Sequence, residues 1–265
     1  MLTRVSEIHG DPTIHMEEMT WEEYAARVGG GAVVLLPCGA VEQHGPHLPL
    51  KADAFIATKL AERVAREIHG LVAPCFMYGH KSQALSGGGQ IFPGTTSLDA
   101  HTIACVVRDV LRELLRHGVR RVLVLNGHGE NAFPLYEGVD LALREARPDG
   151  VKVVVTGWWQ LIPEARIREL FPGEFPGWDL EHGAITETSL MLALDRDAVR
   201  TERIRDETMP FVPGWSTFPQ PPDLIPRSGL MSGASAASAR LGEQLLETIL
   251  AGMRELIRRE FATPP

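Results

Sequence analysis

Four short apolar runs, separated by segments with helical spacing, constrain the fold of this chain more than any other feature. Residues 32–37 read AVVLLP, residues 121–126 read RVLVLN and residues 151–156 read VKVVVT, whereas residues 71–74 form a shorter and weaker run. Continuous runs of aliphatic and β-branched residues are typical of strands that are buried on both faces, as in parallel sheets. We therefore expect buried strands at these positions.

The segments between these runs have the spacing of helices. The expected helices span residues 21–28, 54–69, 99–117, 131–147 and about 234–261. Thr20 is a plausible N-cap for the first helix, and Gly70 and Gly118 are typical of residues that follow a helix end. Strands that alternate with such helices predict βαβ units, and hence an α/β fold with a mostly parallel sheet covered on both faces.

The chain shows no shift in composition that would mark a domain boundary. Its 265 residues allow one large domain or two small ones. Residues 209–233 are rich in Pro, Gly and Ser, but only one expected helix follows them. We interpret this segment as a long loop packed on the same domain, and we expect a single domain over residues 1–265.

Composition and charge narrow the class of protein. Apolar residues make up 44% of the chain and charged residues 23%, which is typical of a soluble globular protein. The net charge of −8 argues against a nucleic-acid partner, because a nucleic-acid-binding face needs clustered basic residues. Three widely spaced cysteines favour a reducing compartment. No apolar run approaches about 18 residues, and residues 1–7 do not resemble a signal peptide, so we expect a cytoplasmic protein with no membrane partner.

Two polar segments directly follow expected strands, at the edge of an open α/β sheet where ligands bind. Residues 39–53 follow the first strand, and residues 126–131 follow the run at 121–126. Imidazole and carboxylate ligands without thiolate suit zinc or manganese. The candidate ligands in these segments are Glu42, His44, His47, Asp53, His128 and Glu130.

Spacing favours metal binding by two pairs within this set. Residues i and i+2 of an extended segment point the same way, so Glu42 can converge with His44, and His128 with Glu130. A shared carboxylate such as Asp53 can bridge two ions about 3.5–4 Å apart, which together hold and deprotonate one water. Any single histidine is more often an ordinary surface or core residue, but two such pairs at strand ends favour a metal site.

The remaining candidate side chains each have a plainer alternative. His47 has no partner at matching spacing, and we expect a loop role for it. His182 can act as a general acid or base near neutral pH. Glu187 can bind a metal or orient a base, although an ordinary carboxylate in the first turn of a helix is slightly favoured by the sequence alone.

Glycines and tryptophans add weaker signals. The run at residues 87–89 allows a backbone to approach a ligand closely, but a bare glycine run is more often a flexible loop. Trp158, Trp159, Trp178 and Trp215 can stack on a flat heterocycle or belong to the core. Because Trp158 and Trp159 follow a strand, one of the pair is expected to face the core and the other the site.

Taken together, these motifs resemble the creatininase (creatinine amidohydrolase) family over about residues 20–260. The resemblance begins with Glu42-Gln43-His44-Gly45, Asp53 and Asn126-Gly127-His128. Longer and more specific matches to creatininase proper lie at residues 78–83, 86–89, 92–99, 137–145 and 177–183.

The resemblance implies a fold, an assembly and a ligand set. The fold is a three-layer αβα sandwich, usually assembled as a homohexamer, and the reaction is the reversible hydrolysis of the creatinine lactam to creatine at two metal ions. Glu42, Asp53 and His128 would hold one ion, and His44, Asp53 and Glu130 would hold the other. The implied substrate-binding residues are Ser86, Gly129, Trp159, Trp178, Asp179 and His182.

A mechanism and its alternatives follow from this resemblance. Hydroxide held near Asp53 would attack the amide carbonyl, and His182 would deliver a proton to the leaving ring nitrogen. Asp179 or Glu181 would pair with a guanidinium-like group, and the resemblance favours Asp179. Creatininase proper has tyrosine where this chain has Gly129, so another family amidase that acts on a different small amide, formamide or peptide is the alternative.

Two further classes of function stay open on the sequence alone. One is a metal-binding or ligand-binding protein without catalysis. The other is a nucleotide-binding α/β protein that uses the glycine run at residues 87–89. The absence of a lysine-containing phosphate loop argues against the second.

Overall fold

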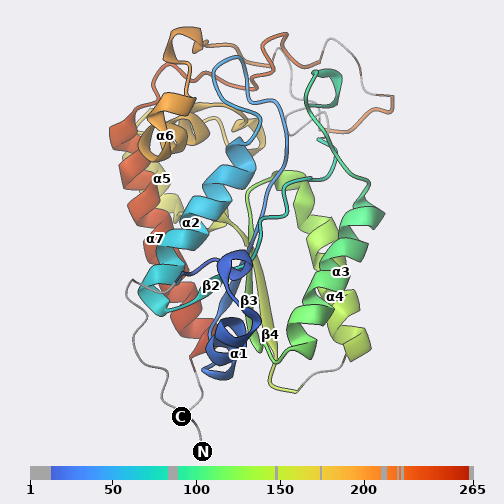
Figure 1. Cartoon of the computed structure of the whole chain (residues 1–265). Coiled ribbons are helices and arrows are strands. Elements are labelled where there is room, and N and C mark those ends of the chain that lie inside the picture. Colours follow the sequence, from blue (N-terminus) through green and yellow to red (C-terminus); the bar gives the residue numbers. More distant parts are fainter. Residues whose placement is uncertain are drawn as a thin grey trace, which may run out of the picture.

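A four-stranded parallel sheet forms the middle layer of the structure (Figure 1). The computed structural model describes residues 13–82, 89–146, 149–173, 175–209, 214–219, 221 and 224–262. The strands are β1 (Val34–Cys38), β2 (Leu71–Val72), β3 (Arg121–Asn126) and β4 (Lys152–Gly157), in the order β2-β1-β3-β4. All three pairings are parallel, so the carboxyl ends of β1, β3 and β4 meet at one edge.

Helices cover both faces of this sheet, which confirms the predicted α/β sandwich. The helix α1 (Trp21–Gly29) contributes Val28 to the core on the face of α3 and α4. That face carries α3 (Ala100–Arg116) and α4 (Ala132–Ala146). The opposite face carries α2 (Ala52–Ile68), α5 (Glu164–Leu170), α6 (Ile185–Leu194) and α7 (Ala239–Phe261).

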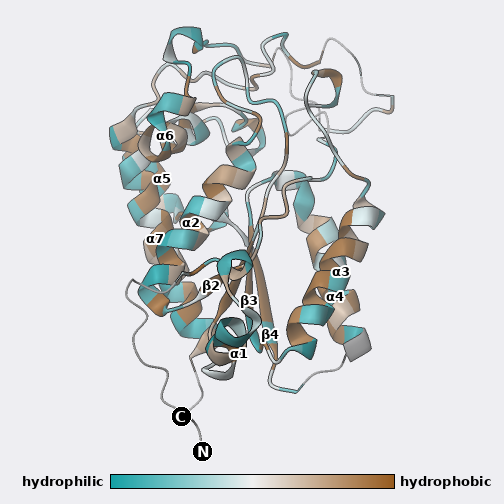
Figure 2. Ribbon diagram, viewed as in Figure 1, coloured by the Kyte–Doolittle hydropathy of each residue, from teal (hydrophilic) through white to brown (hydrophobic). Residues whose placement is uncertain are grey.

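Burial explains why these residues form a layered structure. Every residue of β1 is buried, and the apolar side chains of the sheet divide between two clusters, one on each face. Figure 2 shows hydrophobic strands between helices that are hydrophobic on some sides and hydrophilic on others. The parallel strands are thus covered on both sides, as their continuous apolar runs predict.

The ends of the elements differ from the sequence prediction by a few residues. β1 is shifted to Val34–Cys38, and β2 covers only Leu71–Val72. α2 begins two residues before the predicted start, and α7 begins at Ala239 rather than near residue 234. The prediction of Thr20 as an N-cap is confirmed, because its hydroxyl accepts a hydrogen bond from Glu23 N.

Gly70, which was predicted to end α2, is not the residue that adopts the helix-ending conformation. His69 has the left-handed conformation (φ 52°) that ends the helix, and Gly70 comes next. A Cβ at Gly70 would lie 3.0 Å from Val33 O, so this glycine serves the close approach of the chain to β1. The prediction for Gly118 is confirmed, since it has a φ of 96° directly after His117.

Some of the predicted features lie outside the described residues or touch them only in part. Residues 1–7, Ser86 and the glycines at 87 and 88 are outside the described ranges. Within the segment 209–233, Met209, Ile225 and Met231 form a small core cluster of their own. None of the helices formed by the described residues combines the length and the apolar character needed to cross a membrane.

The contact between α6 and α7 depends on a glycine. A Cβ built at Gly242 would lie 1.9 Å from Ser189 O. We expect Gly242→Ala to lower the free energy of unfolding by about 1–3 kcal/mol, because overpacking forces the two helices apart. Urea denaturation of the purified protein measures this change.

Gly29 provides the matched control, because a Cβ there would meet nothing within 4 Å. Gly29→Ala is expected to leave the free energy of unfolding unchanged or to raise it by up to about 1 kcal/mol. Equal effects of the two substitutions would show that α6 and α7 are not as closely packed as described.

Candidate active site

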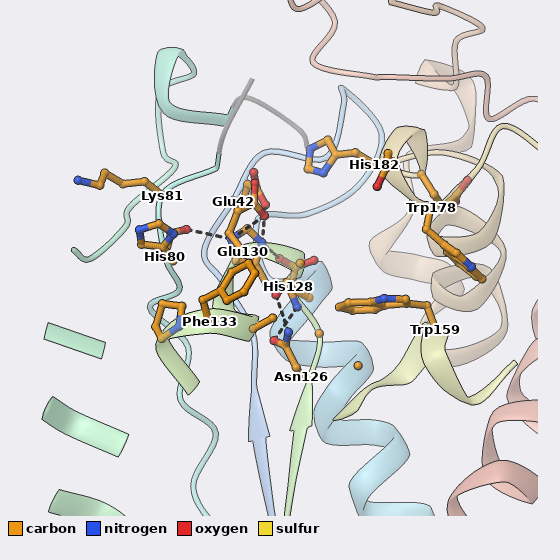
Figure 3. A pocket seen from close by; sticks show the side chains of 18 of the residues that line it. Glu42, His80, Lys81, Asn126, His128, Glu130, Phe133, Trp159, Trp178 and His182 are labelled. Carbon is orange, nitrogen blue, oxygen red and sulfur yellow. Dashed lines mark hydrogen bonds and ion pairs between the residues drawn. The ribbon is translucent and has the colours of Figure 1, made fainter. Parts of the chain in front are cut away.

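The candidate site lies at the carboxyl edge of the sheet, where the predicted metal segments leave β1 and β3. Cys38 at the end of β1 pairs with Asn126 at the end of β3, so the two segments start side by side. A cavity of about 820 Å³ opens above this edge. Figure 3 shows its lining side chains converging from β-strand ends, from α4 and from the segment before α6. The predicted residues that line it are Glu42, Asp53, His128, Gly129, Glu130, Trp158, Trp159, Trp178, Asp179, Glu181, His182 and Glu187.

Two glycines let α2 approach the strand ends and so position Asp53. A Cβ at Gly39 would lie 2.3 Å from Ala54 N, and a Cβ at Gly127 would lie 2.4 Å from Asp53 O. No side chain fits at either position without displacing the backbone of α2. Asp53 therefore enters the site from the first turn of α2, directly above the ends of β1 and β3.

The buried side chains form two groups that share Asp53. In the first group, His128 Nδ1 lies 3.1 Å from Glu42 Oε2 and 3.1 Å from Asp53 Oδ2. In the second group, His44 Nε2 lies 2.8 Å from Asp53 Oδ1 and 3.7 Å from Glu187 Oε2. Each group offers three ligand atoms within 4.8 Å of one another.

Both histidines are held by backbone carbonyls through their other ring nitrogen. His128 Nε2 lies 2.9 Å from His80 O, and His44 Nδ1 lies 3.1 Å from Glu42 O. A carbonyl accepts only from an N–H, so each bond directs the opposite nitrogen toward the carboxylates. Metal-binding histidines are oriented in the same way by the partner of their second nitrogen.

Charge balance within this buried cluster shifts the pKa of each member. Burial would lower the pKa of His44, but the charges of Asp53 and Glu187 outweigh it and raise the pKa to about 10. Burial would also lower the pKa of His128, which Glu42 and Glu130 instead hold well above its usual range. The carboxylate cluster thus binds positive charge strongly.

The pKa values of two carboxyl groups in the cluster, Asp53 and Glu187, shift in opposite directions. Burial would raise the pKa of Asp53, but the charge of His44 and the close contact with His128 Nδ1 hold it well below its usual range. Glu187 has fewer such partners, and burial raises its pKa to about 8. Asp53 is therefore the carboxylate that most strongly retains its negative charge.

The donor set fits divalent cations. Glu42 Oε2 and Asp53 Oδ2 are buried and accept no hydrogen bond from the described residues, although both face His128 Nδ1. Buried carboxylate oxygens without a donor are costly unless a cation satisfies them. Carboxylate oxygens with imidazole nitrogens, and no thiolate, are the ligands of zinc and manganese sites.

Glu130 lies on the other side of His128 from the first group. Its Oε2 is 3.5 Å from His128 Nε2, the nitrogen that contacts the His80 carbonyl. His44 belongs to two three-residue groups, one with Glu42 and His182 and one with Asp53 and Glu187. The group that shares Asp53 contains Glu187 in the place that the family resemblance gives to Glu130. The prediction of an extended segment at His128 and Glu130 is wrong, because Gly129–Asn131 forms a 3-10 helix. The two side chains lie close together, but Glu130 faces Nε2 of His128, whereas Glu42 and Asp53 face Nδ1.

His182 lies above the cluster, with its ring centroid 4.4 Å from that of His44. Its Nε2 is 2.8 Å from the backbone oxygen of Gln43 and 3.0 Å from Gln43 Nε2. Burial lowers the pKa of His182 to about 4, so the imidazole is neutral near pH 7. A neutral ring beside the cavity can accept or relay a proton at the nitrogen that Gln43 does not engage.

Three tryptophans build one wall of the cavity. Trp158 is 2% exposed and packs edge to face against both Trp159 and Trp178, with centroids 5.6 Å and 5.8 Å away. Trp158 belongs to the wall's buried side, whereas Trp159 and Trp178 lie along the cavity in Figure 3. Asp179 is exposed and also lines the cavity, and Trp215 is 63% exposed and is not among its lining residues.

Sequence reasoning missed several residues that hold the site together. Ser82 Oγ donates to Glu42 Oε1, and Asn126 fixes the turn before His128 through its side-chain amide. Gln43 positions His182, and Phe133 lines the cavity from the first turn of α4. Ser82, Asn126 and Gln43 lie inside the motifs quoted above, whereas Phe133 lies outside them. The partners of Ser82 and Gln43 are 40 or more residues away in the sequence, so spacing gave no signal for these contacts.

His47 is fully buried and connects the first metal segment to α6. Its Nε2 lies 2.7 Å from Thr188 Oγ1, and that hydroxyl donates to Gly183 O. Gly183 N in turn donates to Glu187 Oε2. His47 does sit in a turn, as predicted, but this chain of hydrogen bonds shows that it also fixes the segment that carries Glu187.

Comparison with known proteins shows which family the chain belongs to. Residues 17–257 match the sequence model of creatininase, described as creatinine amidohydrolase. The chain belongs to the creatininase family. It is a hydrolase that acts on amide carbon–nitrogen bonds.

Individual relatives lie at different distances within this family. The creatinine amidohydrolase of Pseudomonas putida is 46% identical over 96% of this chain and 98% of its own length. A mycofactocin precursor peptide peptidase of Mycobacterium tuberculosis is 34% identical over 65% of this chain and 62% of its own length.

Solved creatininase structures have the same fold. A crystal structure of creatinine amidohydrolase covers 96% of this chain and all of its own, with 46% identity and a TM-score of 0.93. Creatininases of 45% identity have also been solved in a manganese form and as a variant, both in a zinc–zinc form and in complex with creatine, with TM-scores of 0.91–0.92.

The hydrogen bond between His47 and Thr188 generates a stability prediction. Thr188→Val removes the only acceptor recorded for His47 Nε2 among the described residues and leaves a buried N–H without a partner. We expect the free energy of unfolding to fall by about 1–3 kcal/mol. Chemical denaturation measures it.

Thr188→Ser is the matched control, because it keeps the hydroxyl at the same position. It should retain most of the stability that Thr188→Val loses. If serine and valine destabilise the protein equally, the loss comes from packing of the methyl group and not from the bond to His47.

Proposed function

We propose that this chain is a binuclear metal-dependent amidohydrolase that converts creatinine to creatine by reversible opening of the lactam. The observation that carries the proposal is the sharing of Asp53 by two buried ligand groups at the floor of a tryptophan-walled cavity. The name of the Pseudomonas putida relative and the creatine complex of a solved creatininase support creatinine as the substrate. The zinc and manganese forms of solved creatininases support zinc or manganese as the bound metals.

The proposed ligand sets meet at Asp53. Glu42, Asp53 and His128 would hold one ion. His44 and Asp53 would hold the other, with Glu130 as the third ligand by resemblance and Glu187 as the third ligand by proximity in the structure. Divalent ions so bound would polarise the amide carbonyl as Lewis acids and lower the pKa of a water molecule.

His182 is the proposed acid and base of the reaction. Its ring is neutral near pH 7, and Gln43 fixes the ring through Nε2, which leaves Nδ1 for proton transfer. The lactam nitrogen must gain a proton as its bond to the carbonyl carbon breaks. We assign to His182 Nδ1 both steps of this transfer: it would accept a proton from the attacking water and then deliver that proton to the lactam nitrogen.

Substrate orientation is assigned to the indole wall and its neighbours. Trp159 and Trp178 would stack on the flat creatinine ring and exclude bulk water. Asp179, which is exposed to the cavity, would pair with the guanidinium-like part of the substrate. The family resemblance adds the Gly129 backbone and Ser86, which lies outside the described residues.

A second candidate is a related amidase that acts on another small amide, a formamide or a peptide. Two observations favour it as the alternative: the similarity to mycofactocin precursor peptide peptidases, and the open space around Gly129. Turnover of such amides without turnover of creatinine would select this function.

The assembly follows from the family resemblance, and the location follows from the three widely spaced cysteines, which favour a reducing compartment. We propose a single-domain subunit that forms a homohexamer in the cytoplasm, with a small cyclic amide as its partner. Light scattering of the purified protein measures the number of subunits.

Removal of the shared carboxylate tests the metal site. Asp53→Asn keeps the size of the side chain but removes the charge that both ligand groups use. We expect loss of measurable creatinine hydrolysis and a lower content of zinc or manganese per subunit. Elemental analysis and an assay of creatine formation give the two readouts.

Asp109→Asn is the control for this substitution, since Asp109 is exposed and lies outside the cavity. It should leave both metal content and turnover unchanged. Two bound ions and normal turnover in the Asp53 variant would eliminate the bridging role.

Removal of His182 tests proton transfer. His182→Ala is expected to reduce turnover of creatinine by about 10²–10⁴-fold, as for other acid–base residues, while metal content stays intact. Steady-state kinetics with metal-loaded enzyme measures it, and His101→Ala at an exposed position of α3 is the control. A loss smaller than tenfold would reduce His182 to a binding residue.

A further inference from the structure

The cavity continues past the metal cluster toward α4. Gly129 lies on its wall directly after His128, and a Cβ there would meet no atom within 4 Å. Gly129 is also absent from the glycines with a positive φ, so its backbone does not require the missing side chain. Nothing at position 129 therefore separates the cluster from the space in front of α4.

Two aromatic side chains stand at the far end of this space. Phe133 is 82% exposed, and its ring meets that of Tyr136 edge to face with a centroid distance of 6.4 Å. Both residues line the cavity, together with Ala132 and Pro134. Figure 3 places Phe133 and Trp159 on opposite sides of His128, so aromatic rings flank the cluster from two directions.

The exposure of Phe133 is unfavourable unless a ligand covers it. A phenylalanine in the first turn of a helix that is four-fifths exposed contributes little to the core. Covering its ring would remove apolar surface from water, which is a favourable contribution to binding. The same ring offers edge and face contacts to an aromatic group.

The size of the cavity exceeds what one small ring needs. Its volume of about 820 Å³ lies in the range of sites that enclose drug-sized ligands. Creatinine is a single five-membered ring, and the wall of Trp159 and Trp178 suffices to hold it. A substrate amide extends from its carbonyl carbon in two directions, through the acyl group and through the nitrogen. Only a substrate with a further substituent reaches both the tryptophan wall and the aromatic side chains of α4.

We propose that Phe133, Tyr136 and the open position at Gly129 form a second subsite, the α4 subsite, which binds an apolar or aromatic substituent of the amide substrate. The inference rests on the proposed function and narrows its substrate class. The enzyme then prefers small amides, such as N-substituted creatinines, whose substituent extends past Gly129 to the ring of Phe133.

Two substrates and two variants test the α4 subsite. The substrates are creatinine and the analogue in which a benzyl group replaces its N-methyl group. The selectivity is the ratio of kcat/KM for the benzyl analogue to kcat/KM for creatinine, measured on metal-loaded enzyme. We expect Phe133→Ala to lower this ratio at least tenfold by removing the contact. Gly129→Tyr should lower it similarly by filling the passage.

Trp21→Ala is the matched control, because Trp21 is 77% exposed in α1 and does not line the cavity. It should leave the selectivity unchanged. The proposal is overturned if both variants keep the wild-type ratio, or if the wild-type enzyme hydrolyses creatinine but not the benzyl analogue. In that case the proposed creatininase activity stands alone.

Two further outcomes separate the remaining explanations. If neither amide is hydrolysed by enzyme with ions bound, the proposed function fails first and the α4 subsite falls with it. If Phe133→Ala changes the molar mass in light scattering but not the selectivity, a second copy of the chain covers Phe133, and the subsite is rejected.

Discussion

The burial of carboxylates at the carboxyl edge of the sheet is the constraint on which the site depends. Glu42 and Asp53 are almost inaccessible to water, and each has an oxygen that no donor among the described residues satisfies. Such a cluster is stable only with positive charge beside it. In the metal-free protein, protonated His44 and His128 supply that charge. Bound divalent ions would supply it instead, and the two rings would then be deprotonated, because a metal binds only the neutral imidazole.

The scaffold serves this cluster through close backbone approaches and a few long-range hydrogen bonds. Gly39 and Gly127 let α2 approach the strands, so that Asp53 reaches both histidines. Residues 39–53 hold α6 and the segment before it by two contacts, His47 with Thr188 in α6 and Gln43 with His182 before α6. One continuous set of contacts therefore positions both the candidate metal ligands and His182. The shape of the cavity above them determines which substrate binds.

Periodicity predicted the layers of the fold, because continuous apolar runs have few alternatives to buried parallel strands. Spacing by two residues placed His128 and Glu130 on one side of an extended segment, but Gly129–Asn131 turns into a 3-10 helix, and Glu130 faces a different ring nitrogen of His128 than Glu42 does. The contacts of His47, Ser82 and Gln43 join residues that are distant in sequence, and they depend on how the loops fold over the sheet edge. The end of α2 moved by one residue, because Gly70 serves the close approach to Val33 and the left-handed turn falls on His69 instead.

The most direct test of the account is NMR spectroscopy of creatinine incubated with purified protein loaded with zinc or manganese. If the buried carboxylates hold catalytic ions, creatinine and creatine interconvert, the conversion stops when a chelator removes the metal, and it resumes when the metal is restored. Interconversion that continues at full rate in metal-free protein would contradict the assignment of the buried carboxylate cluster as a catalytic metal centre. Absence of any conversion with two ions bound would exclude creatinine as the substrate.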